Sequence, residues 1–296
     1  MVKLEFPNYF KVNDSVKIFY STNFALDAYE PKKPLIVFNY GLACNINHWK
    51  FQIAYFHKKG YQLLCHDYRG HYNSSNNIQA CDVTFNNIVG DIHALLNSIE
   101  AKNVFMLGHS MGVNVTLEYA KNHPHQMLGM GLISGTVLPP QDVMFNSKIM
   151  NIINPLQKEL MARFPKLYES IWKSAFLNPL TRKLIHLGGF NADTVPDSFI
   201  QTYLKKASEL SPQMFTQLLD QMQDHDVLAY LDKIQTKTLV IAGDEDKVIP
   251  LDVQKIVHAN LPSSSLYIVK KGSHVPQVDF PDRINKKVYD FLKSLL

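Results

Sequence analysis

One serine of this chain is followed by two kinds of side chain that can cooperate with it in nucleophilic catalysis. A serine hydroxyl is a poor nucleophile at neutral pH, so it needs a base within hydrogen-bond reach and a carboxylate that orients the base. Ser110 lies in the pentapeptide Gly108–Gly112, of the form Gly-x-Ser-x-Gly. An acidic run at 244–246 and a histidine, His274, follow later in the chain. The chain therefore contains all three types of side chain that such catalysis needs.

The elements predicted around these residues alternate between strand and helix. Short apolar runs predict buried strands, and amphipathic stretches predict the helices between them. The predicted strands cover 16–21, 35–39, 61–66, 103–107, 127–134, 238–242 and 265–269, and the predicted helices cover 47–59, 84–99, 113–122, 251–260 and 281–295. This alternation indicates an α/β protein with a mostly parallel sheet. The serine, the acids and the histidine each follow a strand, so we expect them at one edge of that sheet.

The alternation stops between residues 138 and 233, where helical patterns dominate. We therefore predict a core formed by 1–137 and 234–296, with a helical cap inserted at 138–233. The insertion has ten basic and ten acidic residues and five of the ten methionines, with many phenylalanines. Such residues commonly form a core of their own. Because the insertion follows the carboxyl end of a strand, where open α/β sheets bind ligands, we favour a lid over an apolar pocket.

Composition and charge exclude several classes of function. The 296 residues carry a formal charge of only +4, without long runs of one sign, which argues against nucleic acid as a partner. The longest mostly apolar stretch, 127–138, is too short to span a bilayer, so no stable membrane insertion is expected. The first ten residues lack the apolar segment of a signal peptide. Cys44, Cys65 and Cys81 are expected to be reduced and buried, and the location cytoplasmic.

The chain resembles α/β-hydrolase-fold serine hydrolases from about residue 16 to residue 295. The Gly-x-Ser-x-Gly pentapeptide is close to the commonest form of the family's nucleophile elbow. The segment 243–250 resembles the family pattern Gly-x-x-Asp-x-x-x-Pro, and this resemblance gives the acid role to Asp246. Asp244 and Glu245 remain alternatives, because three acids are adjacent and their spacing does not separate them.

The same resemblance suggests the base and one half of the oxyanion hole. The loop Gly272–His274 is similar to the family's histidine loop, which implies that His274 is the base. One backbone N–H of the oxyanion hole is expected from Met111, at the start of the helix that follows the serine. The resemblance implies that the second comes from Leu42, after the strand at 35–39.

Two positions depart from the family pattern. Tyr40 stands where relatives usually have histidine, and we expect its hydroxyl near the substrate. His109, inside the elbow, is assigned to the substrate site as well, although a residue at this place usually packs or forms hydrogen bonds. In the segment 67–74, Tyr72 replaces the second glycine of Asp-x-Arg-Gly-x-Gly-x-Ser, a departure that leaves the predicted fold unchanged.

These residues predict a reaction through an acyl-enzyme. A serine at position 110, in place of aspartate, argues against the alkyl-enzyme route of epoxide hydrolases and haloalkane dehalogenases. The expected substrate is a carboxylic ester with an apolar acyl or alkyl group, without a cofactor or metal. The same triad acting on a thioester, an amide or a C–C bond, or in peracid chemistry, stays an alternative. So does a non-catalytic ligand-binding protein, since a fold does not fix a function.

Overall fold

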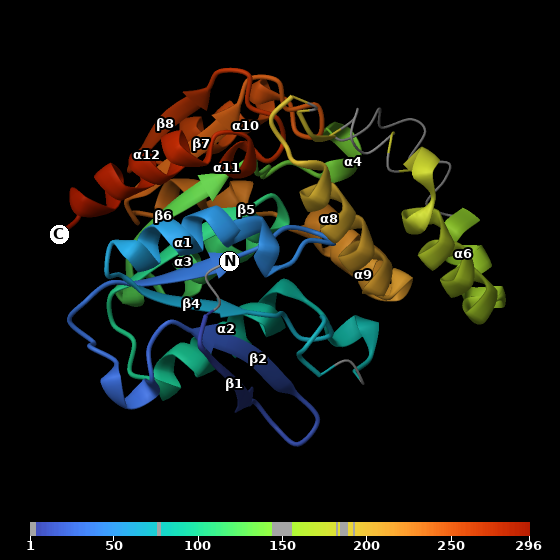
Figure 1. Cartoon of the computed structure of the whole chain (residues 1–296), viewed down its shortest axis with the longest axis horizontal. Helices are drawn as coiled ribbons and strands as arrows, with labels where there is room; N and C mark the ends of the chain where they lie inside the picture. The colour runs from blue at the N-terminus through green and yellow to red at the C-terminus, as the bar shows by residue number, and fades with distance from the viewer. Residues whose placement is uncertain (1–3, 76–77, 144–155, 182, 184–188, 192) are drawn as a thin grey trace.

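The fold was obtained as a computed structural model, which describes the chain except residues 1–3, 76–77, 144–155, 182, 184–188 and 192. Its described part has one eight-stranded sheet in the order β1-β2-β4-β3-β5-β6-β7-β8 (Figure 1). The strands are β1 Phe6–Lys11, β2 Lys17–Thr22, β3 Leu35–Asn39, β4 Gln62–His66, β5 Val104–His109, β6 Met127–Ile133, β7 Thr238–Gly243 and β8 Ser264–Val269. β2 runs antiparallel to both of its neighbours, β1 and β4, and the strands β3 to β8 are parallel to one another.

Helices cover both faces of this sheet. They are α1 Lys50–Lys58, α2 Phe85–Ser98, α3 Met111–Asn122, α10 Leu251–Asn260, α11 Pro276–Asp279 and α12 Pro281–Lys293. Successive residues of a strand point to opposite faces. On β6, Met130 and Leu132 join a core cluster with α3 and α10. Gly129, on the opposite face, lies against Leu295, which follows α12. The sheet is therefore the middle layer of three.

A helical segment joins β6 to β7 and lies beside the sheet (Figure 1). Its described helices are α4 Pro140–Val143, α6 Pro165–Leu177, α8 Asp197–Glu209 and α9 Pro212–Asp224, followed by the 3₁₀ helix η5 Leu228–Lys233. Met214 and Leu218 of α9 belong to the main hydrophobic core of the sheet. We call this segment the insertion. Its inner helices thus complete the core of the sheet, as well as packing on one another.

Most predicted elements appear within one or two residues of their expected bounds, because buried strands leave a clear apolar signal. β1 was not predicted, since five of its six residues are exposed and the strand has no buried face to mark it. The predicted burial of all three cysteines is wrong for Cys81, which is exposed, whereas Cys44 and Cys65 are buried. Among the described residues, no helix is both long and apolar enough to cross a membrane.

Candidate active site

Ser110 lies at the sharp turn between β5 and α3, in a backbone conformation that few residues other than glycine adopt. Its φ is 54° and its ψ is −122°. Such strain persists only where the surrounding structure enforces it. A Cβ on Gly108 would lie 2.5 Å from the carbonyl oxygen of Gly112, and one on Gly112 would lie 2.2 Å from that of Asn39. The two glycines of the pentapeptide are therefore required by the close packing of this turn.

A chain of hydrogen bonds connects Ser110 to a histidine and an acid. His274 Nε2 lies 3.1 Å from Ser110 Oγ, and His274 Nδ1 lies 3.0 Å from Asp246 Oδ2. The side chain of Asp246 is fully buried, and that of His274 is 13% exposed. The serine side chain thus faces a base whose other ring nitrogen is occupied by a carboxylate, which is the arrangement that acyl transfer requires.

The structure separates Asp246 from the two acids beside it. Asp246 Oδ1 accepts hydrogen bonds from the backbone N–H groups of Val248 and Ile249, both at 2.9 Å. Asp244 and Glu245 are exposed, and Asp244 accepts a hydrogen bond from the backbone of Lys271. Of the three adjacent acids, Asp246 is therefore the one placed against His274. Two backbone donors fix its carboxylate before any substrate arrives.

Two glycines bring the acid loop and the histidine loop together. A Cβ on Gly243, at the end of β7, would lie 2.3 Å from the carbonyl oxygen of Gly272. The N–H of Glu245 donates to that same oxygen at 2.9 Å. The loops after β7 and β8 therefore touch, which explains how residues 28 positions apart meet at one edge of the sheet.

The backbone near Ser110 provides candidates for an oxyanion hole. Met111 is the first residue of α3, so its N–H is among those at a helix start that lack an intrahelical acceptor. The loop after β3 passes close by, because a Cβ on Gly41 would lie only 2.8 Å from that of Ser110. Leu42 is the next residue of this loop and is half-buried. Both predicted donors therefore belong to segments that border the serine.

The structure places the Tyr40 side chain differently from the prediction, which put its hydroxyl near the substrate. Its side chain is buried, and its hydroxyl lies 3.5 Å from Asp67 Oδ1 and accepts a hydrogen bond from the N–H of Tyr68. Tyr72, which replaces a family glycine, has a φ of 41° and donates its hydroxyl to the carbonyl of Cys44 at 2.7 Å. Both tyrosines hold the loop that carries Leu42.

His109 also differs from the substrate contact that we expected of it. The ring is buried, and its Nε2–H donates to the backbone carbonyl of His274 at 2.8 Å. Burial, together with the nearby rings of His274 and His48, lowers the pKa of His109 well below its usual value. The ring is therefore neutral, and it fixes the backbone of the base loop. Among the described residues, no group of histidine, cysteine or acidic side chains is arranged to hold a metal ion.

Comparisons with known proteins agree with this fold. A family model described as serine aminopeptidase, S33, matches residues 30–279. A bifunctional esterase/perhydrolase from Acinetobacter calcoaceticus is 22% identical over 97% of this chain and 99% of its own length. A non-heme chloroperoxidase from Burkholderia pyrrocinia is 26% identical over 82% of this chain and 84% of its own. The crystal structure of an enol-lactonase from Burkholderia xenovorans LB400 has a TM-score of 0.77 at 16% identity, covering 97% of this chain and all of that one. The predicted α/β-hydrolase fold is confirmed.

Proposed function

The chain belongs to the serine aminopeptidase S33 family, and we propose that it is a serine hydrolase of carboxylic esters with lipophilic or medium-sized groups. The observation that carries this proposal is the connected chain Ser110–His274–Asp246, with contacts of 3.1 and 3.0 Å. The name of the esterase/perhydrolase relative is in keeping with this bond type.

In the proposed reaction, Ser110 Oγ attacks the ester carbonyl while His274 Nε2 takes its proton. The N–H groups of Leu42 and Met111 stabilise the oxyanion of the tetrahedral intermediate. His274 then passes the proton to the departing alcohol, which leaves an acyl group on Ser110. Water, deprotonated by His274, attacks the acyl-enzyme, and the acid and free serine are released. Asp246 keeps the ring in the required tautomer throughout.

The preference for an apolar substrate rests on the surroundings of the base loop. Val275, next to His274, is buried in a cluster with Val195, Phe199 and Ile200 from the insertion. Phe190 packs at the rim of the same cluster. An apolar acyl or alkyl group is the substrate part that such surroundings favour.

The test is a substrate panel with purified wild-type protein and the S110A variant. The panel contains p-nitrophenyl esters of two to twelve carbons, an acyl thioester and an aminoacyl p-nitroanilide. We expect the wild type to prefer esters and S110A to lose turnover by about 10⁴-fold or more. Retained ester turnover in S110A, or a strong preference for the thioester or the anilide, would contradict the proposal.

A second candidate reaction is perhydrolysis, favoured by the names of the perhydrolase and chloroperoxidase relatives. Here hydrogen peroxide replaces water as the nucleophile toward the acyl-enzyme, and a peracid leaves with the serine restored. We expect the ester assay with added peroxide to yield peracid through Ser110 as well. Peracid formation that persists in S110A would exclude this route.

A further inference from the structure

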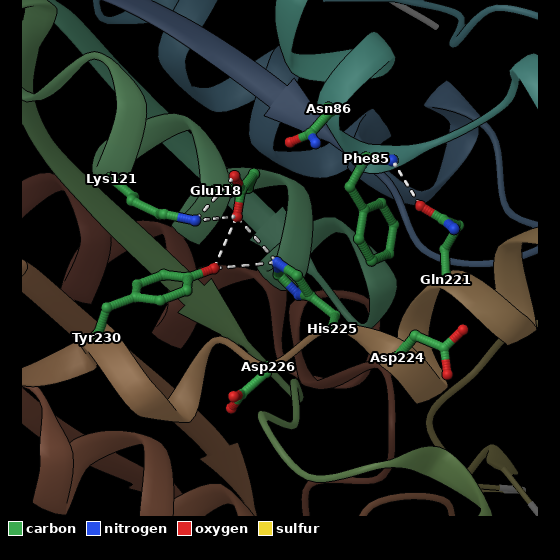
Figure 2. Close-up of a pocket in the computed structure, with 9 residues that line it drawn as sticks. All are labelled: Phe85, Asn86, Glu118, Lys121, Gln221, Asp224, His225, Asp226 and Tyr230. Carbon is green, nitrogen blue, oxygen red and sulfur yellow. Dashed lines mark hydrogen bonds and ion pairs between the residues drawn. The ribbon is translucent and has the colours of Figure 1, made fainter.

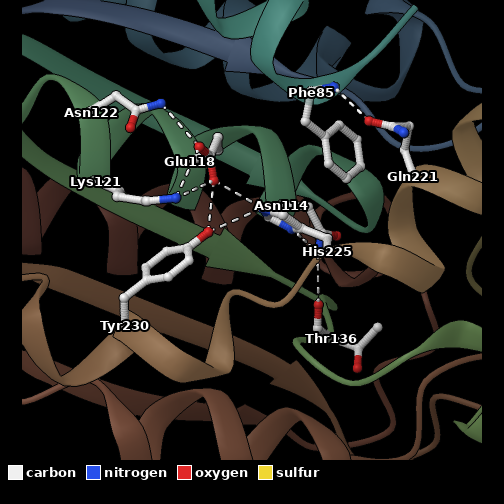
Figure 3. Close-up of polar contacts among 9 residues, drawn as sticks. All are labelled: Phe85, Asn114, Glu118, Lys121, Asn122, Thr136, Gln221, His225 and Tyr230. Carbon is white, nitrogen blue, oxygen red and sulfur yellow. Dashed lines mark hydrogen bonds and ion pairs between the residues drawn. The ribbon is translucent and has the colours of Figure 1, made fainter. Parts of the chain in front are cut away.

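Both ends of the insertion meet on one side chain of the helix that follows the nucleophile. Asn114 is buried on α3, four residues after Ser110. Its Nδ2 donates to the backbone carbonyl of Thr136, at 3.3 Å, and lies 3.1 Å from His225 Nδ1 (Figure 3). Thr136 lies where the chain leaves β6 for the insertion, and His225 directly follows α9, where it returns. A single amide group therefore contacts both ends of the insertion.

These contacts determine where His225 carries its proton. The carbonyl of Thr136 can only accept, so the amide nitrogen of Asn114, and not its oxygen, must face it. The same nitrogen faces His225 Nδ1, which must then be an acceptor without a proton. The proton lies on Nε2, which is 3.0 Å from Glu118 Oε2 and donates to it. His225 is thus neutral, and each of its ring nitrogens has a partner.

Glu118 is the fixed charge of this network. Its side chain is 5% exposed and accepts hydrogen bonds from Tyr230, at 2.7 Å, and Asn122, at 3.0 Å. Burial alone would raise the pKa of Glu118, but the hydrogen bonds, His225 foremost, and the charge of Lys121 lower it to about 2. The carboxylate therefore stays ionised at neutral pH and in mild acid.

Other groups complete the surroundings of His225. The ring of Phe85, from α2, packs edge-on against the imidazole, with ring centroids 4.9 Å apart. Asp224 and Asp226, its neighbours in sequence, line the same cleft as Lys121 and Tyr230 (Figure 2). This cleft opens to solvent between α3 and the end of α9, and it gives protons access to the network.

We propose that His225 is a pH-sensitive positioning residue, and that Asn114 joins both ends of the insertion to the nucleophile helix only while His225 is neutral. Protonation would place an N–H on Nδ1, pointing at the N–H groups of Asn114. The amide can relieve this repulsion by turning its oxygen toward His225. It then loses its hydrogen bond to the carbonyl of Thr136, which frees the first end of the insertion. The effect on catalysis rests on the proposed hydrolase function, but the contacts of Asn114 with Thr136 and His225 do not.

The tautomer is tested first, by ¹⁵N NMR of the histidine rings, with the signal assigned from the H225Q variant. At pH 8 we expect a neutral ring with its proton on Nε2. A ring protonated on Nδ1 at this pH would overturn the proposal. This measurement needs no substrate, so it stands even if the proposed esterase activity fails.

Release of the insertion is tested by hydrogen exchange of residues 134–139 at pH 8 and pH 5.5, corrected for the chemical exchange rate. We expect protection in the wild type to fall about fivefold in acid, as for one lost hydrogen bond. H225Q keeps a donor for Glu118 but cannot ionise, so its protection should not change. H258Q, a histidine variant on α10, is the control and should follow the wild type. Equal behaviour of H225Q and wild type would overturn the proposal.

In the ester assay, the same variants distinguish a role of His225 in positioning the site from a role in the stability of the fold alone. We expect the ratio of kcat/KM for H225Q over wild type to rise about fivefold from pH 8 to pH 5.5. The ratio for H258Q should stay constant. A ratio for H225Q that does not depend on pH, in an enzyme that turns over esters, would contradict a role in the reaction.

Discussion

At the scale of single residues, His274 is held at its ring and at its backbone. Asp246 binds Nδ1 of the ring, and His109 donates to the backbone carbonyl of the same residue at 2.8 Å. Asp246 lies in the loop after β7, whereas His109 is the last residue of β5, so ring orientation and loop position are set independently. This predicts separable effects of the two partners on catalysis.

The variant D246N tests the carboxylate. An amide of the same shape can present its N–H₂ to Nδ1 and so favour the wrong tautomer of His274. We expect kcat for the ester substrate to fall by about 10³- to 10⁴-fold, with little change in KM. Steady-state kinetics at pH 8 measure both constants.

The matched control is E245Q, at the exposed acid beside Asp246. It should keep kcat within about twofold of the wild type, as surface changes usually do. A large loss in E245Q, or an unchanged kcat in D246N, would remove Asp246 from the proposed mechanism.

At the scale of elements, the packing of the end of β3 against the β5–α3 turn positions the parts of the site. A side chain at Gly112 would collide with the backbone of Asn39 and Tyr40, and backbone cannot move aside as a flexible side chain can. The nucleophile elbow and the loop that carries Leu42 therefore depend on the same contact. Any residue larger than glycine at position 112 should disturb both.

We expect the G112A variant to lose at least about 3 kcal/mol of unfolding free energy, through overpacking. Urea unfolding followed by circular dichroism measures this loss. G90A is the control, because a Cβ on Gly90, in α2, would meet no atom within 4 Å. That variant should gain about 0.5–1 kcal/mol, since alanine favours the helix. Equal stabilities of the two variants would contradict the packing argument.

The elements themselves were predictable, whereas several side-chain roles were not. Leu35–Asn39 is buried along its whole length, so its apolar run gave the bounds of β3 correctly. The exposed β1 offered no such pattern. The sequence also could not show that the Tyr40 hydroxyl points at Asp67, because that contact depends on how β3 and the loop after β4 approach each other. His109 is a similar case, since its partner lies 165 residues away.

At the scale of the whole molecule, buried neutral histidines make the stability of the fold depend on pH. Burial lowers the pKa of His48 and His66 to about 3, and that of His71 to about 4. The unfolded chain, with ordinary histidine pKa values near 6.5, binds more protons than the folded chain below that pH. Stability from these residues is therefore complete above pH 6.5 and is lost as the pH falls toward their folded pKa values.

We predict a steep fall of the unfolding free energy between pH 6.5 and pH 4.5. Each of the three histidines contributes a slope of up to about 1.4 kcal/mol per pH unit in this range. Urea unfolding at pH 7.5, 5.5 and 4.5 measures the total slope. The H66Q variant should reduce this slope by up to about 1.4 kcal/mol per pH unit, the contribution of one proton. A stability that does not depend on pH across this window would show that these histidines ionise inside the fold.

The central claim is that Ser110 is a nucleophile activated by His274, and its most direct test is covalent labelling. The protein is treated with a fluorophosphonate, and the adduct is located by mass spectrometry of peptides. We predict one phosphonyl group per chain, on Ser110, formed at least about 10³-fold more slowly in H274A. An adduct on another residue, or an H274A variant that labels at the wild-type rate, would contradict the account.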